Sequence, residues 1–133
     1  MKTFHLQIVT PDGLYFDGEA EKLIVRASTG DVCILPRHAD YVTALGMGQA
    51  RITTDGDVRK AACIGGMLSV VGNEVRLLPT TFEWADKIDK DRAIKAKEKA
   101  EKRLETAKDR HEQDILEAKL KRALVRVSVY DNR

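Results

Sequence analysis

The chain divides at Trp84 into two segments whose compositions favour different secondary structures. All nine glycines and all three prolines of the 133 residues precede this point. Residues 85–133 contain neither, and Tyr130 is their only aromatic residue. Because glycine and proline mark turns and interrupt helices, we expect many turns in the first segment and helix in the second. The length suffices for one domain, or for a small domain with an appendage, and is too short for two full-sized domains.

Net charge follows the same division. Residues 1–84 carry a net charge of −2 and residues 85–133 a net charge of +4, in agreement with the +2 of the whole chain. No apolar run approaches the roughly 20 residues that a membrane-spanning helix needs, and the N-terminus lacks the pattern of a signal peptide. We therefore expect a soluble, intracellular protein.

The cysteines and histidines form no recognisable metal or redox motif. Cys33 and Cys63 lie in apolar sequence without a C-x-x-C pattern, which predicts buried, reduced thiols. His5, His38 and His111 lack the spacing of zinc ligands, so we expect no metal site.

Short alternating apolar runs, typical of β-strands, occupy most of the first segment. The runs are residues 4–9, 22–26, 31–35, 41–45, 49–54, 58–64, 67–71 and 75–78. Turns are expected at Pro11-Asp12-Gly13, Asp55-Gly56-Asp57, Gly65-Gly66 and Gly72-Asn73. Strands at these intervals without intervening helices indicate an antiparallel sandwich or barrel.

After Trp84 the apolar residues recur at helical spacing. They predict two amphipathic helices of about 20 and 17 residues. Asp86 or Asp89 is a candidate cap for the first helix, and the polar residues 108–111 would let the second helix fold back. Because the apolar stripes are narrow and rich in alanine, we expect the hairpin to bury little area and to detach readily.

The sequence contains no motif of an autonomous enzyme. It lacks a phosphate-binding P-loop, a nucleophile elbow and an H-E-x-x-H motif. Lysines of residues 95–103 alternate with glutamates that can pair with them, and no aromatic residue lies nearby. We therefore favour a solvated charged helix over a nucleic-acid interface.

Six segments carry a resemblance to a known family. They are residues 9–13 (VTPDG), 30–39 (GDVCILPRHA), 45–48 (LGMG), 65–67 (GGM), 88–93 (IDKDRA) and 121–128 (KRALVRVS). In their order, the chain resembles the epsilon subunit of bacterial F-type ATP synthases over essentially its full length. The resemblance implies a ten-stranded antiparallel β-sandwich in residues 1–84, followed by an antiparallel two-helix hairpin in residues 85–133.

The resemblance also implies the biological role. Such a protein is a non-catalytic rotor subunit of a proton- or sodium-translocating synthase, peripheral on the cytoplasmic face of the bacterial cell membrane. Its sandwich would bind the gamma subunit and the ring of c subunits, with Asp31 and His38 on the loop facing that ring. A turn cap after Pro36 is the alternative role for His38. Cys33 and Arg37 stand where the family has glycine.

The helices would regulate the complex. In the compact state they would lie against the sandwich. In the extended state they would rise along gamma and bring basic residues to an acidic segment of the catalytic beta subunit, next to alpha, which blocks ATP hydrolysis. The net charge of +4 and the weak alanine packing are compatible with such a change.

The string Ile88-Asp89-x-x-Arg92-Ala93 resembles the ATP-binding motif of some epsilon subunits. No cofactor is required, but the resemblance implies that the compact hairpin binds regulatory ATP. The expected ATP-binding residues are Glu83, Asp89, Arg92, Lys99, Arg122 and Arg126. The carboxylates would accept hydrogen bonds from adenine or ribose, and the cations would hold the triphosphate. ATP-binding members have arginine in place of Lys99, whose point charge grips phosphate less specifically.

Two alternatives stay open at this stage. Asp89 and Arg92 would also fit an ordinary pair on a helix surface. The whole chain would also fit a stand-alone module that binds a small molecule or a nucleic acid. Such a module would not co-purify with synthase subunits.

Overall fold

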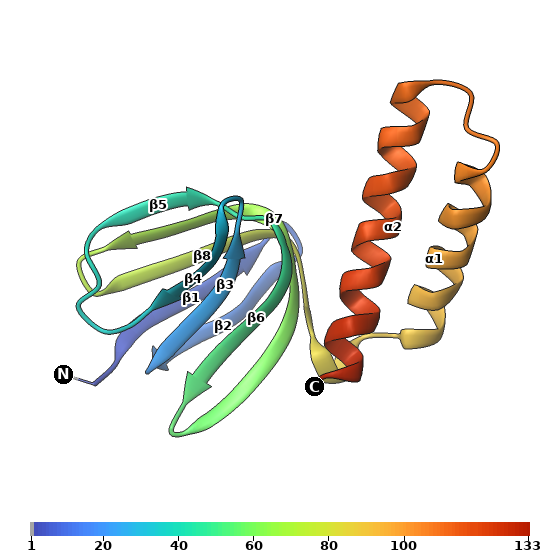
Figure 1. Cartoon of the computed structure of the whole chain (residues 1–133). Coiled ribbons are helices and arrows are strands. Elements are labelled where there is room, and N and C mark those ends of the chain that lie inside the picture. Colours follow the sequence, from blue (N-terminus) through green and yellow to red (C-terminus); the bar gives the residue numbers. More distant parts are fainter. Residues whose placement is uncertain (1) are drawn as a thin grey trace.

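The computed structural model describes residues 2–133, as a β-sheet structure followed by two helices (Figure 1). The strands are β1 (Phe4–Thr10), β2 (Gly13–Ala20), β3 (Lys22–Ala27), β4 (Gly30–Ile34), β5 (Tyr41–Ala44), β6 (Met47–Thr54), β7 (Asp57–Val71) and β8 (Glu74–Trp84). A short 3-10 turn, η1 (Ala85–Lys87), leads into α1 (Lys90–Leu104) and α2 (Arg110–Asp131). The predicted order of sandwich and hairpin is confirmed.

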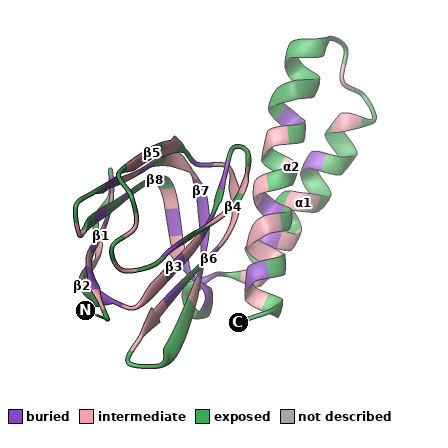
Figure 2. Ribbon diagram, turned by 60° about the vertical axis from the view of Figure 1, so that its left-hand side comes forward, coloured by how far each residue is buried: buried purple, intermediate pink, exposed green. Residues whose placement is uncertain are grey.

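The strands form one curled sheet that encloses a core. Their order is β2-β1-β8-β7-β6-β3-β4, and β5 pairs with β7. All neighbours are antiparallel except β1 and β8, which run parallel with His5 opposite Glu74. Alternate side chains point inward, so the buried residues of opposing strands meet between the layers (Figure 2). The largest fully buried side chains are Phe4, Phe82, Leu6, Ile8, Leu23, Ile34, Ile52, Leu68, Leu77, Val25, Val70 and Val75.

The sandwich has eight strands among residues 2–133, not the ten expected. The turn predicted at Gly65-Gly66 does not form, because both glycines lie inside the 15-residue strand β7. Their φ angles of 69° and 100° bend the strand without ending its pairing with β8. One bent strand therefore replaces two separate ones.

Strand β2 was not predicted from the sequence, because its residues show no clear alternation of apolar and polar side chains. It pairs with β1 across the confirmed turn, with Thr10 opposite Gly13. Asp17 and Gly18 interrupt its apolar alternation, and most of its side chains remain partly exposed at the edge of the sheet. Because few side chains of this edge strand are buried, its sequence does not need to alternate between apolar and polar residues, and the strand leaves little periodicity to detect.

The helices differ in length from the expectation. α1 has 15 residues and α2 has 22, and the break lies between Leu104 and Arg110. Asp89 caps α1, where its carboxylate accepts a hydrogen bond from the Arg92 backbone N–H at 3.1 Å. Asp109 caps α2 in the same way, accepting from Glu112 N–H at 2.8 Å. This second cap starts α2 inside the polar stretch that was expected to separate the helices.

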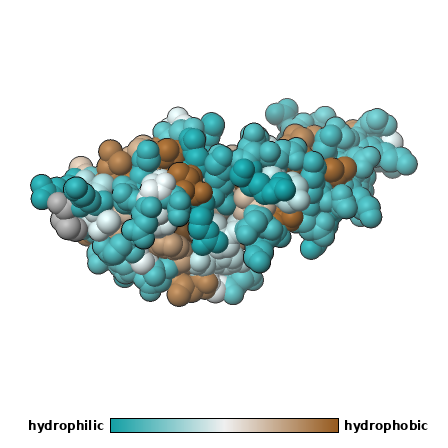
Figure 3. All heavy atoms as spheres, turned by 90° about the horizontal axis from the view of Figure 1, so that it is seen from below, coloured by the Kyte–Doolittle hydropathy of each residue, from teal (hydrophilic) through white to brown (hydrophobic). Residues whose placement is uncertain are grey.

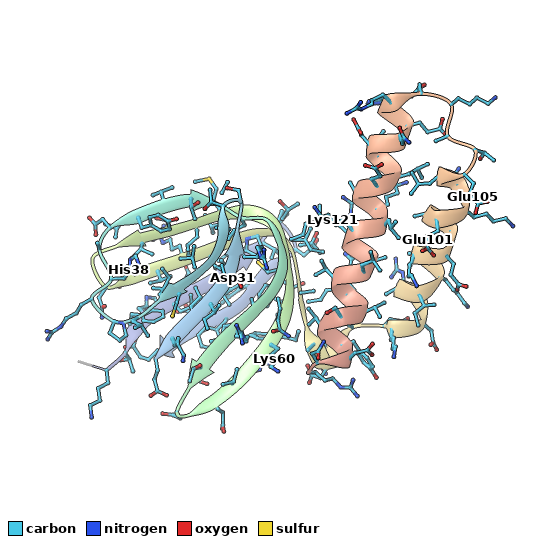
Figure 4. The ribbon with its side chains drawn as sticks, in the orientation of Figure 1. Asp31, His38, Lys60, Glu101, Glu105 and Lys121 are labelled. Atoms are coloured by element: carbon cyan, nitrogen blue, oxygen red, sulfur yellow. The ribbon has the colours of Figure 1, made fainter. Side chains whose placement is uncertain are left out.

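The hairpin packs on the sandwich mainly through α2, which lies beside β6 and β7 (Figure 1). A small cluster of Ala62, Ala85, Ile88 and Val129 forms the contact. The Lys60 ammonium on β7, labelled in Figure 4, donates a hydrogen bond to the Asn132 carbonyl at 2.7 Å. The partly buried Val125 and Tyr130 pack against this cluster, so few apolar side chains join the two parts.

The cysteines do not share one environment. Cys33 is exposed on β4, an edge strand whose alternate side chains face solvent, so the prediction of a buried thiol is wrong there. Cys63 is buried as predicted, and burial raises the pKa of its thiol to about 12.

The face of the molecule seen in Figure 3 is largely hydrophilic, with separate apolar patches on the sandwich and the helices. Large exposed apolar side chains are Leu14, Leu35, Val42, Val58, Met67, Val71, Leu78, Ile115 and Leu124. No helix in residues 2–133 is long and apolar enough to span a membrane.

Candidate functional site

A cleft opens where β8 leaves the sandwich and the hairpin begins. Its volume is about 470 Å³. The lining residues are Asp12, Tyr15, Thr81, Phe82, Glu83, Lys87, Asp89, Arg92, Ala93, Ala96 and Arg126. They come from the β1–β2 turn, β2, β8, η1 and both helices, so the cleft exists only while the hairpin is docked.

Glu83 and Arg126 join the two sides of the cleft. The Arg126 Nε on α2 donates a hydrogen bond to the Glu83 carboxylate on β8. The Arg126 side chain is 27% exposed and the Glu83 side chain is 34% exposed, so water only partly screens the ion pair. This ion pair places a cation and a carboxylate at the interface between sandwich and hairpin.

Asp89 and Arg92 lie at the start of α1. The Asp89 carboxylate accepts from the Arg92 backbone N–H, and the structure shows no salt bridge between the two side chains within residues 2–133. Arg92 is exposed, and its guanidinium is available to an anion in the cleft. The two residues thus form a helix cap rather than the ordinary surface ion pair considered above.

Lys99 and Arg122 lie in a second depression that adjoins the first. This groove of about 260 Å³ runs between α1 and α2 and shares Ala96 and Arg126 with the cleft. The six predicted ATP-binding residues are therefore brought together in two neighbouring depressions. Glu83, Asp89 and Arg92 line the first, Lys99 and Arg122 line the second, and Arg126 lines both.

Several lining residues were missed by the sequence analysis. Arg103 follows Lys99 by four residues, and Lys119 precedes Arg122 by three, so helical spacing was a sufficient signal for both. Asp12 and Tyr15 reach the cleft through the β1–β2 hairpin. No local pattern connects that hairpin with α1, so only the tertiary structure reveals them.

Asp31 and His38 lie apart on the sandwich (Figure 4). Asp31 belongs to β4 and forms a salt bridge with Arg26 at 2.9 Å, so the expectation that it shares a loop with His38 is corrected. His38 lies on the loop after β4, with Nδ1 2.7 Å from the Ala39 carbonyl oxygen. A contact of either residue with a c ring stays a prediction.

Two family models together match almost the whole chain. The model "ATP synthase, Delta/Epsilon chain, beta-sandwich domain" matches residues 3–85. The model "ATP synthase, Delta/Epsilon chain, long alpha-helix domain" matches residues 86–131. The chain belongs to the ATP synthase delta/epsilon chain family. The family match argues against the stand-alone binding module. Together with the full-length relatives described next, it confirms the assignment to the ATP synthase epsilon chains, which are a non-catalytic subunit.

Full-length relatives support membership in the epsilon chain family. The ATP synthase epsilon chain of Ruminococcus albus is 39% identical over 134 residues, and the alignment covers all of both chains. The ATP synthase epsilon chain of Bacillus velezensis is 42% identical over 132 residues, which cover 99% of this chain and all of the relative.

Solved structures share the fold of this epsilon family member. A chain of the Euglena gracilis mitochondrial ATP synthase superposes with a TM-score of 0.80 and 18% identity, covering 91% of this chain and 77% of that one. A chain of the Tetrahymena thermophila mitochondrial ATP synthase, in a structure of the central stalk and c ring, has a TM-score of 0.68 and 10% identity and covers 95% of both chains. These likenesses show that the sandwich and hairpin occur together in distant ATP synthases.

Proposed function

We propose that this epsilon chain is a central-stalk subunit of a bacterial F-type ATP synthase. It couples ring rotation to the catalytic head, inhibits ATP hydrolysis through its helices, and senses ATP through the docked hairpin. The observation that carries the sensing role is the convergence of Glu83, Asp89, Arg92 and Arg126 on one cleft between hairpin and sandwich. A ligand in that cleft holds the two parts together.

The cleft has a suitable size and charge arrangement for a nucleotide. Ligand sites typically enclose about 300–1,000 Å³, and this one encloses about 470 Å³. The carboxylates of Glu83 and Asp89 accept hydrogen bonds from adenine or ribose, and Tyr15 and Phe82 supply an apolar wall. The triphosphate extends toward Arg92 and then along the neighbouring groove to Lys99, Arg122 and Arg126.

Binding of ATP then favours the compact state. Because the lining residues separate when the hairpin leaves the sandwich, ATP binds the docked form and not the extended one. At a concentration 100 times its dissociation constant, such a ligand stabilises the docked form by ~2.7 kcal/mol. The small apolar contact around Ile88 and Val129 leaves the undocked form accessible when ATP is scarce.

The partners proposed for the sandwich are gamma and the c ring. An exposed apolar patch on β5, β7 and β8 supports protein contact, because Met67 lies opposite both Ala44 and Leu78 in the sheet register. We assign gamma to this patch and the c ring to the loop of His38. The extended hairpin, with its net charge of +4, approaches an acidic part of beta beside alpha. Membrane contact occurs only through the complex, on the cytoplasmic face.

Calorimetric titration of the full chain with ATP tests the sensing role. The wild type is expected to give saturable heat, and Arg92→Gln to raise the dissociation constant about 10-fold or more, since a hydrogen bond to a charged group contributes roughly 1.5–3 kcal/mol. Lys95→Gln, an exposed residue of the same helix outside the cleft, is the matched control and should bind like the wild type. Absence of heat at millimolar ATP, or equal loss in both variants, would contradict the proposal.

Removal of residues 88–133 from a reconstituted complex tests the inhibitory role. Because the helices would no longer reach beta, the rate of ATP hydrolysis should rise while the complex stays assembled. An unchanged rate in an assembled complex would contradict inhibition by the hairpin. Loss of assembly would instead show that the hairpin is needed to hold the subunit in place.

A further inference from the structure

The groove between the two helices is lined by cations along both walls. We call it the basic groove. Its charged residues are Lys99, Arg103, Lys119, Arg122 and Arg126. Its floor consists of Ala96, Ala100, Leu116 and Ala123, and no aspartate or glutamate lines it. Five cations around a small apolar floor are suited to binding an anion that carries several negative charges.

Four of these cations have no carboxylate partner in the part of the chain that the structure describes. Lys99, Arg103, Lys119 and Arg122 form no salt bridge within residues 2–133, whereas Arg126 pairs with Glu83. The glutamates of α1 that were expected to pair with its lysines form no salt bridge within that helix. Direct ion pairs within residues 2–133 therefore compensate only one of the five cations of the groove.

Packing of α1 against α2 brings these positive charges close to one another. α1 and α2 are antiparallel, so Lys99 and Arg103 on one wall face Lys119, Arg122 and Arg126 on the other. Like charges that line one narrow groove repel each other and raise the free energy of the closed hairpin. A multivalent anion in the groove removes this repulsion and stabilises the closed hairpin.

The shape of the basic groove favours an elongated anion. The groove lining on α1 runs from Ala96 to Arg103, which are seven residues apart, or about 10 Å at 1.5 Å per residue. Lys119 and Arg126 span about 10 Å of α2 by the same measure. No aromatic residue lines the groove, so stacked bases have no platform there. Arginine guanidinium groups bind phosphate oxygens in pairs, which suits a chain of phosphates.

We propose that the basic groove binds linear polyphosphate, a chain of phosphate groups joined by anhydride bonds. Lys99, Arg122 and Arg126 also belong to the proposed ATP site, whereas Arg103 and Lys119 extend the row of cations away from the cleft. The chain of phosphates can come from inorganic polyphosphate or from the tail of a nucleoside polyphosphate. Binding in the groove needs none of the adenine or ribose contacts of Glu83 and Asp89.

Calorimetry on the full chain at low salt, with inorganic tripolyphosphate and with a longer linear polyphosphate, tests this proposal. The double variant Arg103→Gln/Lys119→Gln is expected to raise the dissociation constant of the longer polyphosphate about 10-fold or more. The control Lys95→Gln/Lys102→Gln removes the same charge from residues outside the groove and should change it less than about 2-fold. Thermal unfolding of both variants shows whether they remain folded.

Three outcomes separate this proposal from the ATP site. Equal weakening in the two double variants means diffuse attraction to a basic surface and overturns the proposal. Binding of ATP without binding of inorganic polyphosphate also overturns it, while the proposed ATP sensing survives. Binding of inorganic polyphosphate that depends on Arg103 and Lys119 supports it, even where ATP gives no heat.

Discussion

Arg126 on α2 donates a hydrogen bond to Glu83 on β8, a residue 43 positions earlier in the chain. The pair joins the hairpin to the sandwich at a point where few apolar groups do so. Arg126 also lines both depressions of the candidate site. An anionic ligand therefore competes with Glu83 for the guanidinium, and the same side chain serves docking when no ligand is bound.

Glu83→Gln should loosen the docked hairpin. A partly exposed ion pair contributes about 1 kcal/mol, or about fivefold in an equilibrium. Hydrogen exchange of α2 amides should therefore accelerate about fivefold, while the β-strands keep their exchange rates. Glu98→Gln, at an exposed position of α1 without a salt bridge in residues 2–133, is the control and should leave exchange unchanged. Unchanged exchange in Glu83→Gln would mean that the pair does not hold the hairpin.

Gly66→Ala should destabilise the sandwich strongly. A Cβ at this position would lie 2.1 Å from the Leu78 carbonyl oxygen, and φ is 100°. We expect a loss of at least about 3 kcal/mol in the free energy of unfolding, measured with urea. Gly56→Ala is the control, because its φ of 82° is also unfavourable but no atom lies within 4 Å of the added Cβ. Equal losses in the two variants would show that backbone strain alone, rather than the clash, sets the effect.

His5 should make stability depend on pH. Its ring nitrogens lie 2.5 Å from carboxylate oxygens of Asp17 and Glu74, and these hydrogen bonds raise the pKa of His5 above its usual value of about 6.5. A raised folded-state pKa stabilises the protein below pH 6.5, and this contribution disappears as pH rises through the folded-state pKa.

Urea unfolding at several pH values measures this contribution. Wild type should lose stability relative to His5→Gln as pH rises from 6 to 8, by less than about 1 kcal/mol because the groups are partly exposed. His111→Gln, at an exposed position of α2, should follow the wild-type profile. Parallel curves for wild type and His5→Gln would exclude a proton-linked role of His5.

The two thiols should differ in reactivity. Cys33 is exposed and should react with an aromatic disulfide reagent in the native protein. Cys63 is buried with its pKa raised to about 12, so it should react only after unfolding. The native protein should thus release one equivalent of thiolate product and the unfolded protein two, and Cys33→Ser should abolish the native reaction. Two equivalents from native protein would contradict the burial of Cys63.

The sequence predicts much of the fold where local signals act alone. The turns at Asp55-Gly56 and Gly72-Asn73 and the cap at Asp89 follow from residue preferences within four positions. The glycine pair Gly65-Gly66 led to a wrong prediction of a turn, because the positive φ angles that glycine permits occur both in turns and in bends within a strand. Only the pairing of both halves of β7 with β8 distinguishes these cases.

The candidate site shows the same limit. Helical spacing groups Asp89, Arg92 and Lys99, and the structure places all three beside the interface between the helices and the sandwich. Tyr15 could not be found in this way, because it reaches the cleft only through the pairing of β2 with β1. Contacts between segments far apart in the sequence depend on tertiary packing, which residue preferences do not encode.

The bend at Gly65-Gly66 also has a mechanical consequence. Because β7 continues through the bend, one uninterrupted strand of 15 residues runs from the hairpin side of the sandwich to the β7–β8 turn, where Asn73 accepts a hydrogen bond from the Arg37 backbone N–H. A twisting load applied at one end reaches the other through the backbone and a row of hydrogen bonds loaded in shear, instead of through a flexible loop. We expect the sandwich to be stiff along this axis, which is what the proposed transmission of rotation would require.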